Sequence, residues 1–229
     1  LKGKIPCHVL AVMEALSRAG HCGYLVGGSL RDLLRGVVPH DYDLTTDATP
    51  EEMMVVFSDF RVIPTGLQHG TLTVLSGGEG VEVTTHRVDG VYTDSRRPDR
   101  VEFTRNIEDD LSRRDFTVNA RAYNEKRGLI DLFGGESDLE NKIIRAVGDP
   151  EKRFTEDALR IMRAFRFSAQ LGFDIEERTL LAARRLSPRL KNIARERIGS
   201  EFIRLLASPE PERSLTLMDH VIYEILPVE

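Results

Sequence analysis

The 229-residue chain has no tryptophan, only two cysteines and no apolar stretch long enough to cross a bilayer. Cys7 and Cys22 belong to no CxxC motif or cysteine–histidine cluster. This excludes a disulfide framework and a structural zinc site, and we expect two inert thiols in the core. Residues 1–20 carry interspersed charges and have the pattern of an amphipathic helix, not of a signal peptide. These absences favour a cytoplasmic protein without membrane association.

A strong charge of one sign is also missing. The chain has 32 Lys+Arg against 37 Asp+Glu, a net charge of -5, which argues against coating nucleic acid by charge alone. The segment Arg184–Arg204 nevertheless holds seven basic residues and two acidic ones. It predicts either a place where RNA phosphates bind or, equally well, a solvated helix face.

The sequence changes character along its length. Short β-branched and apolar runs alternate with helical stretches in the first part, whereas the second part is almost wholly helical in pattern. The change predicts an α+β protein. A catalytic head over residues 1–145, with a mixed sheet flanked by helices, would be followed by an all-helical neck and the start of a body over residues 146–229.

Several elements are specific enough to test. Strands are expected at 69–76 and 80–88, joined by a glycine turn, and Thr49 should cap a helix that has Pro50 at its first position. A long helix is expected to start at Thr155 as N-cap and run to Gln170. The polar, turn-rich segment 88–100 is the expected mobile loop.

The sequence Asp41-Tyr42-Asp43 can carry metal chemistry. On a strand, residues i and i+2 share a face, so the two carboxylates project together. Two negative charges at such a short distance repel each other unless a cation lies between them, and carboxylate oxygens are ligands that suit Mg²⁺. A pair of Mg²⁺ ions can activate an attacking hydroxyl and stabilise a leaving pyrophosphate. Taken alone, the pattern also fits a turn with solvated aspartates.

A glycine turn precedes the aspartates. Gly27 and Gly28 close a strand, and Ser29 and Arg31 follow in the first turn of a helix. Glycines let backbone amides approach a phosphate closely, and Gly28, Ser29 and Arg31 could hold a triphosphate. The alternative is a structural turn with Arg31 in a salt bridge. Neither GxGxxG nor GxxxxGK[ST] is present, so dinucleotide and P-loop sites are unsupported.

The run GGSLRD followed by HDYDL resembles the signature of the polymerase-beta-type nucleotidyltransferases. More specifically, it is similar to the bacterial class II tRNA nucleotidyltransferases, or CCA-adding enzymes, and their poly(A) polymerase relatives. The resemblance covers nearly the whole chain through the motifs GLQHGTLTV, VEVTTHRVDG, DDLSRRDFTVNARAYN, LIDLFGG, RFTEDALRIMRAFRF and RERIGSEFIRLL. It implies a polymerase-beta-like head, two metal ions and nucleoside triphosphate substrates.

The resemblance also assigns roles. It implies that Asp41 and Asp43 bind the metals and that Arg114 and Asp115 hold the ribose, although these last two also fit a surface charge cluster. Telling ribose from deoxyribose requires a polar partner for the 2′-hydroxyl. Glu82 is a possible third carboxylate on a neighbouring strand, with a structural role as the alternative.

Asp157, Arg160 and Arg163 would lie in one row on the expected long helix. The plain interpretation is an exposed ion pair. The functional one is base selection, because a carboxylate beside a guanidinium matches the amine and adjacent ring acceptor of cytosine and of adenine, and repels the carbonyl of uracil or guanine. The resemblance supports base recognition by Asp157 and Arg160, and contact of Arg163 with the triphosphate.

We therefore expect a template-independent enzyme that adds C and A from CTP and ATP to the tRNA 3′ end, with two Mg²⁺ ions. The alternatives are an A-adding enzyme, a poly(A) polymerase and a catalytically silent RNA- or nucleotide-binding module. CC-adding members of the family have a shortened flexible loop at the position of segment 88–100. The length of this segment here therefore disfavours an enzyme that adds only CC. Family members usually continue well past RERIGSEFIRLL, so we expect a truncated chain or a reduced RNA-binding region.

Overall fold

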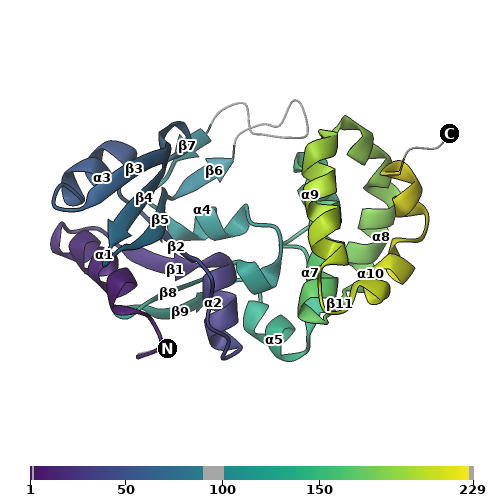
Figure 1. The fold of residues 1–229 in the computed structure, drawn as a ribbon, viewed down its shortest axis with the longest axis horizontal. Helices are drawn as coiled ribbons and strands as arrows, with labels where there is room; N and C mark the ends of the chain where they lie inside the picture. Colours follow the sequence, from purple (N-terminus) through teal and green to yellow (C-terminus); the bar gives the residue numbers. More distant parts are fainter. Residues whose placement is uncertain (2, 90–100, 227–229) are drawn as a thin grey trace. The chain divides into compact units, whose positions relative to one another are not determined.

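A seven-stranded mixed sheet organises the first part of the chain, in a computed structural model that describes residues 1, 3–89 and 101–226 (Figure 1). The strand order is β3-β4-β5-β2-β1-β8-β9. The strands are β1 (Gly23–Val26), β2 (Tyr42–Thr46), β3 (Arg61–Gly66), β4 (Thr71–Ser76), β5 (Glu79–Thr85), β8 (Arg121–Asn124) and β9 (Gly128–Asp131). β2 and β5 pair in parallel, and the other neighbours are antiparallel. The expected strand at 69–76 is confirmed as β4, which begins at Thr71. The expected strand at 80–88 is confirmed only as far as Thr85, where β5 ends, and residues 87–88 belong to β6 (Arg87–Asp89) of a separate two-stranded sheet. The alternating apolar residues of β4 and β5 bury one face of the seven-stranded sheet.

The helices α1 (Cys7–Arg18), α2 (Gly27–Leu34) and α3 (Pro50–Val56) contribute side chains to the hydrophobic core beside this sheet. The 3-10 turn η1 (Leu67–His69) contacts β4, and α4 (Ile107–Ser112) contacts β6. The predicted start of α3 is confirmed: the Thr49 hydroxyl accepts from the Glu52 N–H, and the Glu52 carboxylate accepts from the Thr49 N–H. The expectation that both cysteines lie in the core is wrong, since Cys7 is exposed and Cys22 is half-buried.

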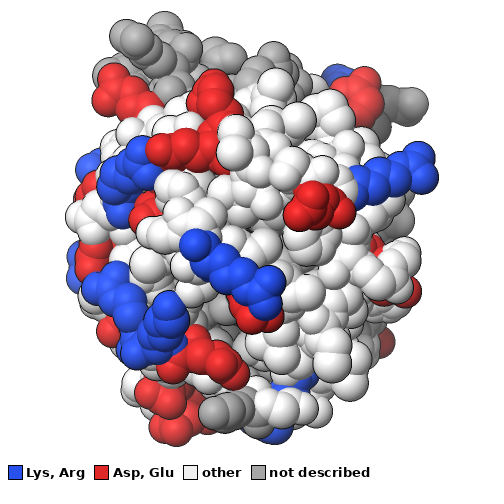
Figure 2. Space-filling view, turned by 90° about the vertical axis from the view of Figure 1, so that its left-hand side faces the viewer, with Lys and Arg blue, Asp and Glu red and all other residues white. Residues whose placement is uncertain are grey.

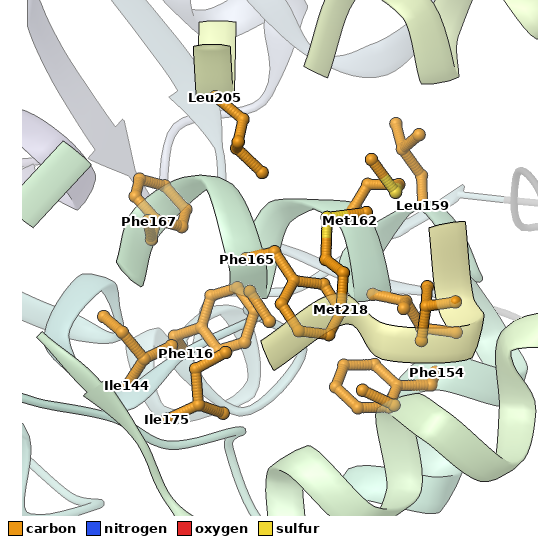
Figure 3. Packing of buried hydrophobic residues seen from close by; sticks show 14 of the residues in the cluster. Phe116, Ile144, Phe154, Leu159, Met162, Phe165, Phe167, Ile175, Leu205 and Met218 are labelled. Carbon is orange, nitrogen blue, oxygen red and sulfur yellow. The ribbon is translucent and has the colours of Figure 1, made fainter. Parts of the chain in front are cut away.

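The second part of the chain is largely helical. Its helices are α5 (Gly135–Glu140), α6 (Pro150–Glu156), α7 (Leu159–Leu171), α8 (Glu177–Leu186), η3 (Ser187–Asn192), α9 (Arg195–Leu206), α10 (Pro211–Met218) and η4 (Asp219–Glu224). Two short strands, β10 (Ile143–Ile144) and β11 (Asp174–Ile175), pair in parallel. Figure 3 shows side chains from several of these helices and strands converging in one apolar cluster, with Phe165 of α7 among them. α7 is buried along most of its length and forms the centre of this core.

The expected helix from Thr155 to Gln170 is confirmed from Leu159 onward as α7, but its start at Thr155 is wrong. Asp149 caps α6, so Thr155 lies inside that helix. Asp157 then interrupts the helical backbone, because it adopts an extended conformation at φ -140° and ψ 104°. The Asp157 Oδ1 accepts from the Leu159 N–H at 3.0 Å. An aspartate side chain competes with the helical backbone for such donors, so it ends α6 and starts α7 instead of continuing one helix.

The chain forms two compact units. The first holds residues 1–89, 101–114 and 119–132, and includes the β6–β7 hairpin (Arg87–Asp89 with Val101–Phe103). The second holds residues 115–118 and residues 133 onward. The 3-10 turn η2 (Thr117–Asn119) is divided between the units, since its first two residues belong to the second and Asn119 belongs to the first. The expected domain boundary after residue 145 stays a prediction. The expected mobile loop at 88–100 lies, after its first two residues, outside the described residues.

Surface charge agrees with the composition. Figure 2 shows Lys and Arg interspersed with Asp and Glu over the described residues of one face. Within residues 1, 3–89 and 101–226, no helix is both long and apolar enough to cross a membrane.

Candidate active site

Three carboxylates gather at one end of β2. Asp41 lies exposed just before the strand, and Asp43 lies half-buried within it. The parallel register places Asp43 directly opposite Glu82 of β5. Burial raises the pKa of Asp43, with Asp41 adding to the rise and Arg114 opposing it. Desolvation and then the charges of Asp43 and Asp41 raise the pKa of Glu82. The three negative charges therefore repel one another, and a cation would relieve that repulsion.

The donor set fits Mg²⁺ as an open site. Among the residues that the structure describes, no group of three or more acidic, histidine or cysteine side chains could hold a metal ion by itself. Mg²⁺ is usually bound by only one or two carboxylates together with substrate phosphates and water. Asp41 and Asp43 match that arrangement, in which a nucleotide completes the coordination.

The glycine turn at the start of α2 lies against these carboxylates. Gly27 adopts φ +67°, and a Cβ built on it would lie 3.6 Å from the Asp43 Oδ2 and 3.4 Å from the Arg114 Nη1. Ser29, in the first turn of α2, donates to the Val26 carbonyl at 2.8 Å and accepts from the Asp43 N–H at 3.4 Å. Its hydroxyl thus ties the glycine turn to β2. The triphosphate roles of Gly28 and Ser29 stay predictions.

Arg31 is buried in the same helix. Its Nε and Nη2 donate to the Asp32 carboxylate at 2.9 and 3.0 Å, and its Nη1 donates to the Asn119 Oδ1 at 2.9 Å. The salt bridge weighed as the alternative for Arg31 is therefore present, and contact with a triphosphate stays a prediction.

Arg114 and Asp115 are neighbours in sequence but belong to different compact units. Arg114 donates through Nε and Nη2 to the Oδ2 of Asp110, at 3.3 and 2.9 Å. Asp115 accepts from the Phe116 N–H through Oδ1, and its Oδ2 pairs with Arg163 of α7, at 2.8 Å from Nε and 2.5 Å from Nη2. The structure thus joins a residue predicted to hold ribose with one predicted to hold triphosphate.

Asp157 and Arg160 lie at the break between α6 and α7. The Asp157 Oδ2 lies 3.5 Å from the Arg197 Nη2. The Arg160 Nη1 donates to the Glu156 carboxylate at 2.9 Å and to the Arg153 carbonyl at 3.2 Å. Asp157 and Arg160 therefore do not share the face of one helix, as the sequence pattern suggested. Their role in base recognition stays a prediction.

His86 illustrates a structural histidine. Its Nδ1 lies 2.7 Å from the Thr45 hydroxyl, and burial lowers its pKa to about 4.

Three residues not predicted from the sequence, Asp110, Glu156 and Arg197, pair with candidate site residues. Asp110 precedes Arg113 and Arg114 by three and four positions, and Glu156 precedes Arg160 by four, so helical spacing could have found both pairs. Arg197 is 40 positions from Asp157 and gives no local signal.

Comparisons with known proteins show which families the chain resembles. A family model described as the poly A polymerase head domain matches residues 23–145, and one described as a probable RNA- and SrmB-binding site of polymerase A matches residues 172–223. The CCA-adding enzyme of Ligilactobacillus salivarius is 48% identical over 96% of this chain and 54% of its own length. That of Leuconostoc mesenteroides is 51% identical over 90% of this chain and 51% of its own.

A solved structure is also similar. The crystal structure of the Bacillus stearothermophilus CCA-adding enzyme in complex with CTP superposes with a TM-score of 0.85 at 42% identity, covering 92% of this chain and 51% of that one. The chain therefore spans about half the length of the curated relatives it matches.

Proposed function

Because this chain belongs to the poly A polymerase head domain family, we propose that it is a nucleotidyltransferase of the CCA-adding type. It would add C and A from CTP and ATP to the 3′ end of tRNA without a nucleic-acid template. The observation that carries the proposal is the cluster of Asp41, Asp43 and Glu82 beside the Gly27 turn and Arg114. The CCA-adding relatives, one of them bound to CTP, support the choice of acceptor and nucleotide.

Asp41 and Asp43 would hold the Mg²⁺ ions, with Glu82 as the nearest further carboxylate. When bound, the ions supply activation of the RNA hydroxyl and neutralisation of the pyrophosphate charge. The raised pKa of Asp43 and of Glu82 supports this assignment, because each carboxylate is destabilised without a cation nearby.

The protein's own donors would bind the nucleotide. The N-terminal turn of α2, with Gly28 and Ser29, offers backbone amides and positive potential to the triphosphate. Arg31 and Arg163 would add guanidinium donors. Arg114 and Asp115 would hold the ribose, with Asp115 accepting from the 2′-hydroxyl and so favouring ribonucleotides.

Asp157 and Arg160 would select the base. Their side chains are only 18% and 10% exposed, so a base that left one of them unpaired would be strongly disfavoured. Cytosine and adenine each present an amine to the carboxylate and a ring acceptor to the guanidinium. Uracil and guanine present a carbonyl to the carboxylate, which repels it.

The tRNA acceptor would contact the helical part of the chain. The RNA-binding family model at residues 172–223 includes the basic segment Arg184–Arg204. A cytoplasmic location, with tRNA as partner, belongs to the same proposal.

The proposal is tested by incubating the protein with Mg²⁺, labelled CTP or ATP, and tRNAs that end before C74, before C75 or before A76. Two CTP additions followed by one ATP addition are expected, and an Asp41→Ala variant should incorporate neither nucleotide. ATP added only to the tRNA that ends in CC would instead identify an A-adding enzyme, and a long tail a poly(A) polymerase.

If no nucleotide is incorporated, a missing catalytic activity has to be distinguished from weak tRNA binding. Titration of the protein with CTP and Mg²⁺ tests nucleotide binding without RNA. Binding of neither CTP nor ATP would overturn the proposed function. Binding without incorporation, both in this chain and in a version extended to the relatives' length, would favour the silent module.

A further inference from the structure

Asp110 is a buried carboxylate without a part in the nucleotidyl transfer described so far. It lies near the end of α4, and its side chain is 0% exposed. A buried charge is costly unless it is paired, so its partners show what it does.

Each carboxylate oxygen of Asp110 accepts hydrogen bonds from a different guanidinium group. Oδ1 accepts from Arg113, at 3.0 Å from Nε and 2.7 Å from Nη2. Oδ2 accepts from Arg114, at 3.3 Å from Nε and 2.9 Å from Nη2. Burial alone would raise the pKa of Asp110, but the charges of Arg114 and Arg113 outweigh it and hold this pKa below its usual range. The carboxylate is thus ionised and clamps two arginines at once.

The clamp decides which part of Arg114 is left for other contacts. Asp110 engages Nε and Nη2 of the planar guanidinium, so the plane and direction of the group are set. The remaining Nη1 lies 3.4 Å from a Cβ built on Gly27, and the Asp43 Oδ2 lies 3.6 Å from the same point. The oriented end of Arg114 therefore lies at the glycine turn, next to the carboxylate proposed to hold the metal.

We propose that Asp110 is a positioning residue, which fixes the Arg114 guanidinium so that Nη1 points to the incoming nucleotide and helps distinguish ribose from deoxyribose. This inference rests on the proposed function, which places a ribonucleotide at the turn. Without Asp110, Arg114 keeps its charge but loses its fixed direction, because its 18% exposed side chain is free to turn toward solvent.

The test compares Asp110→Asn with Asp109→Asn. Asp109 is the neighbouring aspartate of α4, and its Oδ2 accepts from the Thr104 hydroxyl, so it is a matched control. Dissociation constants for CTP and dCTP are measured with Mg²⁺ and without RNA. Asp110→Asn should weaken CTP binding about tenfold, a loss of about 1.4 kcal/mol. It should weaken dCTP binding less, so the preference for CTP falls. Asp109→Asn should change neither value.

A double-mutant cycle separates positioning from general damage. In an Arg114→Ala background, Asp110→Asn should cause no further loss of CTP binding, because there is no guanidinium left to orient. If Asp110→Asn does not fold, the double variant Asp110→Asn/Arg113→Gln, which restores the local net charge, is compared with Arg113→Gln in the same way.

The outcomes are distinct. Equal losses in the wild-type and Arg114→Ala backgrounds would overturn the positioning role, as would an unchanged preference for CTP over dCTP. A wild-type chain that binds neither nucleotide would overturn the proposed function and this inference with it. A wild-type chain that prefers CTP while Asp110→Asn behaves like Asp109→Asn would overturn the inference alone.

Discussion

Arg163 of α7 donates to Asp115 through Nε and Nη2, at 2.8 and 2.5 Å from the same carboxylate oxygen. Asp115 is only 9% exposed and also accepts from the Phe116 N–H. The pair gives the two residues fixed positions before any nucleotide arrives. A nucleotide that uses both would therefore meet groups that have already lost their rotational freedom.

Removing one member of this pair should impair nucleotide use more than stability. We expect Asp115→Ala to lower kcat/KM for CTP by about tenfold or more, because Arg163 loses its orientation and the 2′-hydroxyl loses its acceptor. The free energy of unfolding should fall by about 1 kcal/mol, since the Arg163 side chain is 37% exposed and solvent screens the pair. Steady-state kinetics and urea denaturation measure the two effects. The exposed Asp59→Ala serves as control, and equal losses of activity in both variants would contradict the prediction.

Asp43→Asn should separate activity from stability. Loss of a metal-binding carboxylate should reduce incorporation at least about a hundredfold, since even residues that merely support such ligands cost 10- to 100-fold. Burial and the Asp41 charge raise the pKa of Asp43, so folding favours its protonated form and the ionised form destabilises the protein at neutral pH. In Mg²⁺-free buffer at pH 7, the variant should therefore have a higher Tm than the wild type. A lower Tm would show that the native site stabilises the Asp43 charge.

Gly27→Ala tests how tightly the glycine turn, Asp43 and Arg114 pack. The matched control is Gly36→Ala, because Gly36 has a similar φ of +76° but open space around its missing Cβ. Both variants should lose about 1–2 kcal/mol from left-handed backbone strain. Only Gly27→Ala should also lose CTP binding, since its methyl group would fill space that touches both Arg114 and Asp43 and would keep a phosphate from approaching the backbone there. Titration with CTP and thermal melting measure both properties, and equal CTP affinities in the two variants would contradict this prediction.

Asp157 offers a variant that keeps its structural role. Asparagine caps helices as well as aspartate does, so Asp157→Asn should keep α7 intact, whereas Asp157→Ala should lose about 1 kcal/mol of stability. Replacing the carboxylate by an amide removes the repulsion of a base carbonyl. Misincorporation of UTP and GTP relative to CTP and ATP should therefore rise in Asp157→Asn. Competition assays with all four nucleotides measure this, and unchanged selectivity in both variants would exclude Asp157 from base choice.

His86 predicts a dependence of stability on pH. Burial lowers its folded pKa to about 4, below the unfolded value of about 6.5. Between these values the unfolded chain binds a proton that the folded chain does not, so stability falls as the pH drops below about 6.5. The contribution of His86 to the free energy of unfolding should fall by about 2 kcal/mol from pH 7 to pH 5. Urea denaturation of the wild type and of His86→Gln at both pH values isolates this change. A constant difference between the two proteins would contradict it.

The sequence by itself determined the local elements whose cause is local. Thr49, Pro50 and Glu52 specify the start of α3 through bonds within one turn, and the alternation of apolar residues in β4 specifies which face is buried. The run from Gly27 to Asp43, together with the motifs that follow it along the chain, predicted the family that the comparisons confirm. Residue type and spacing along the chain were sufficient to predict these features.

Only the tertiary structure decided how those pieces combine. It placed Glu82 opposite Asp43, since strand register depends on the packing of the whole sheet and not on either strand alone. It also broke the expected long helix at Asp157, whose carboxylate bonds the Leu159 amide and lies near Arg197, 40 positions away. The periodicity of apolar residues continues across that break, because both helices bury the same kind of side chain. Where a polar side chain competes with the backbone, the pattern of burial alone does not reveal the outcome.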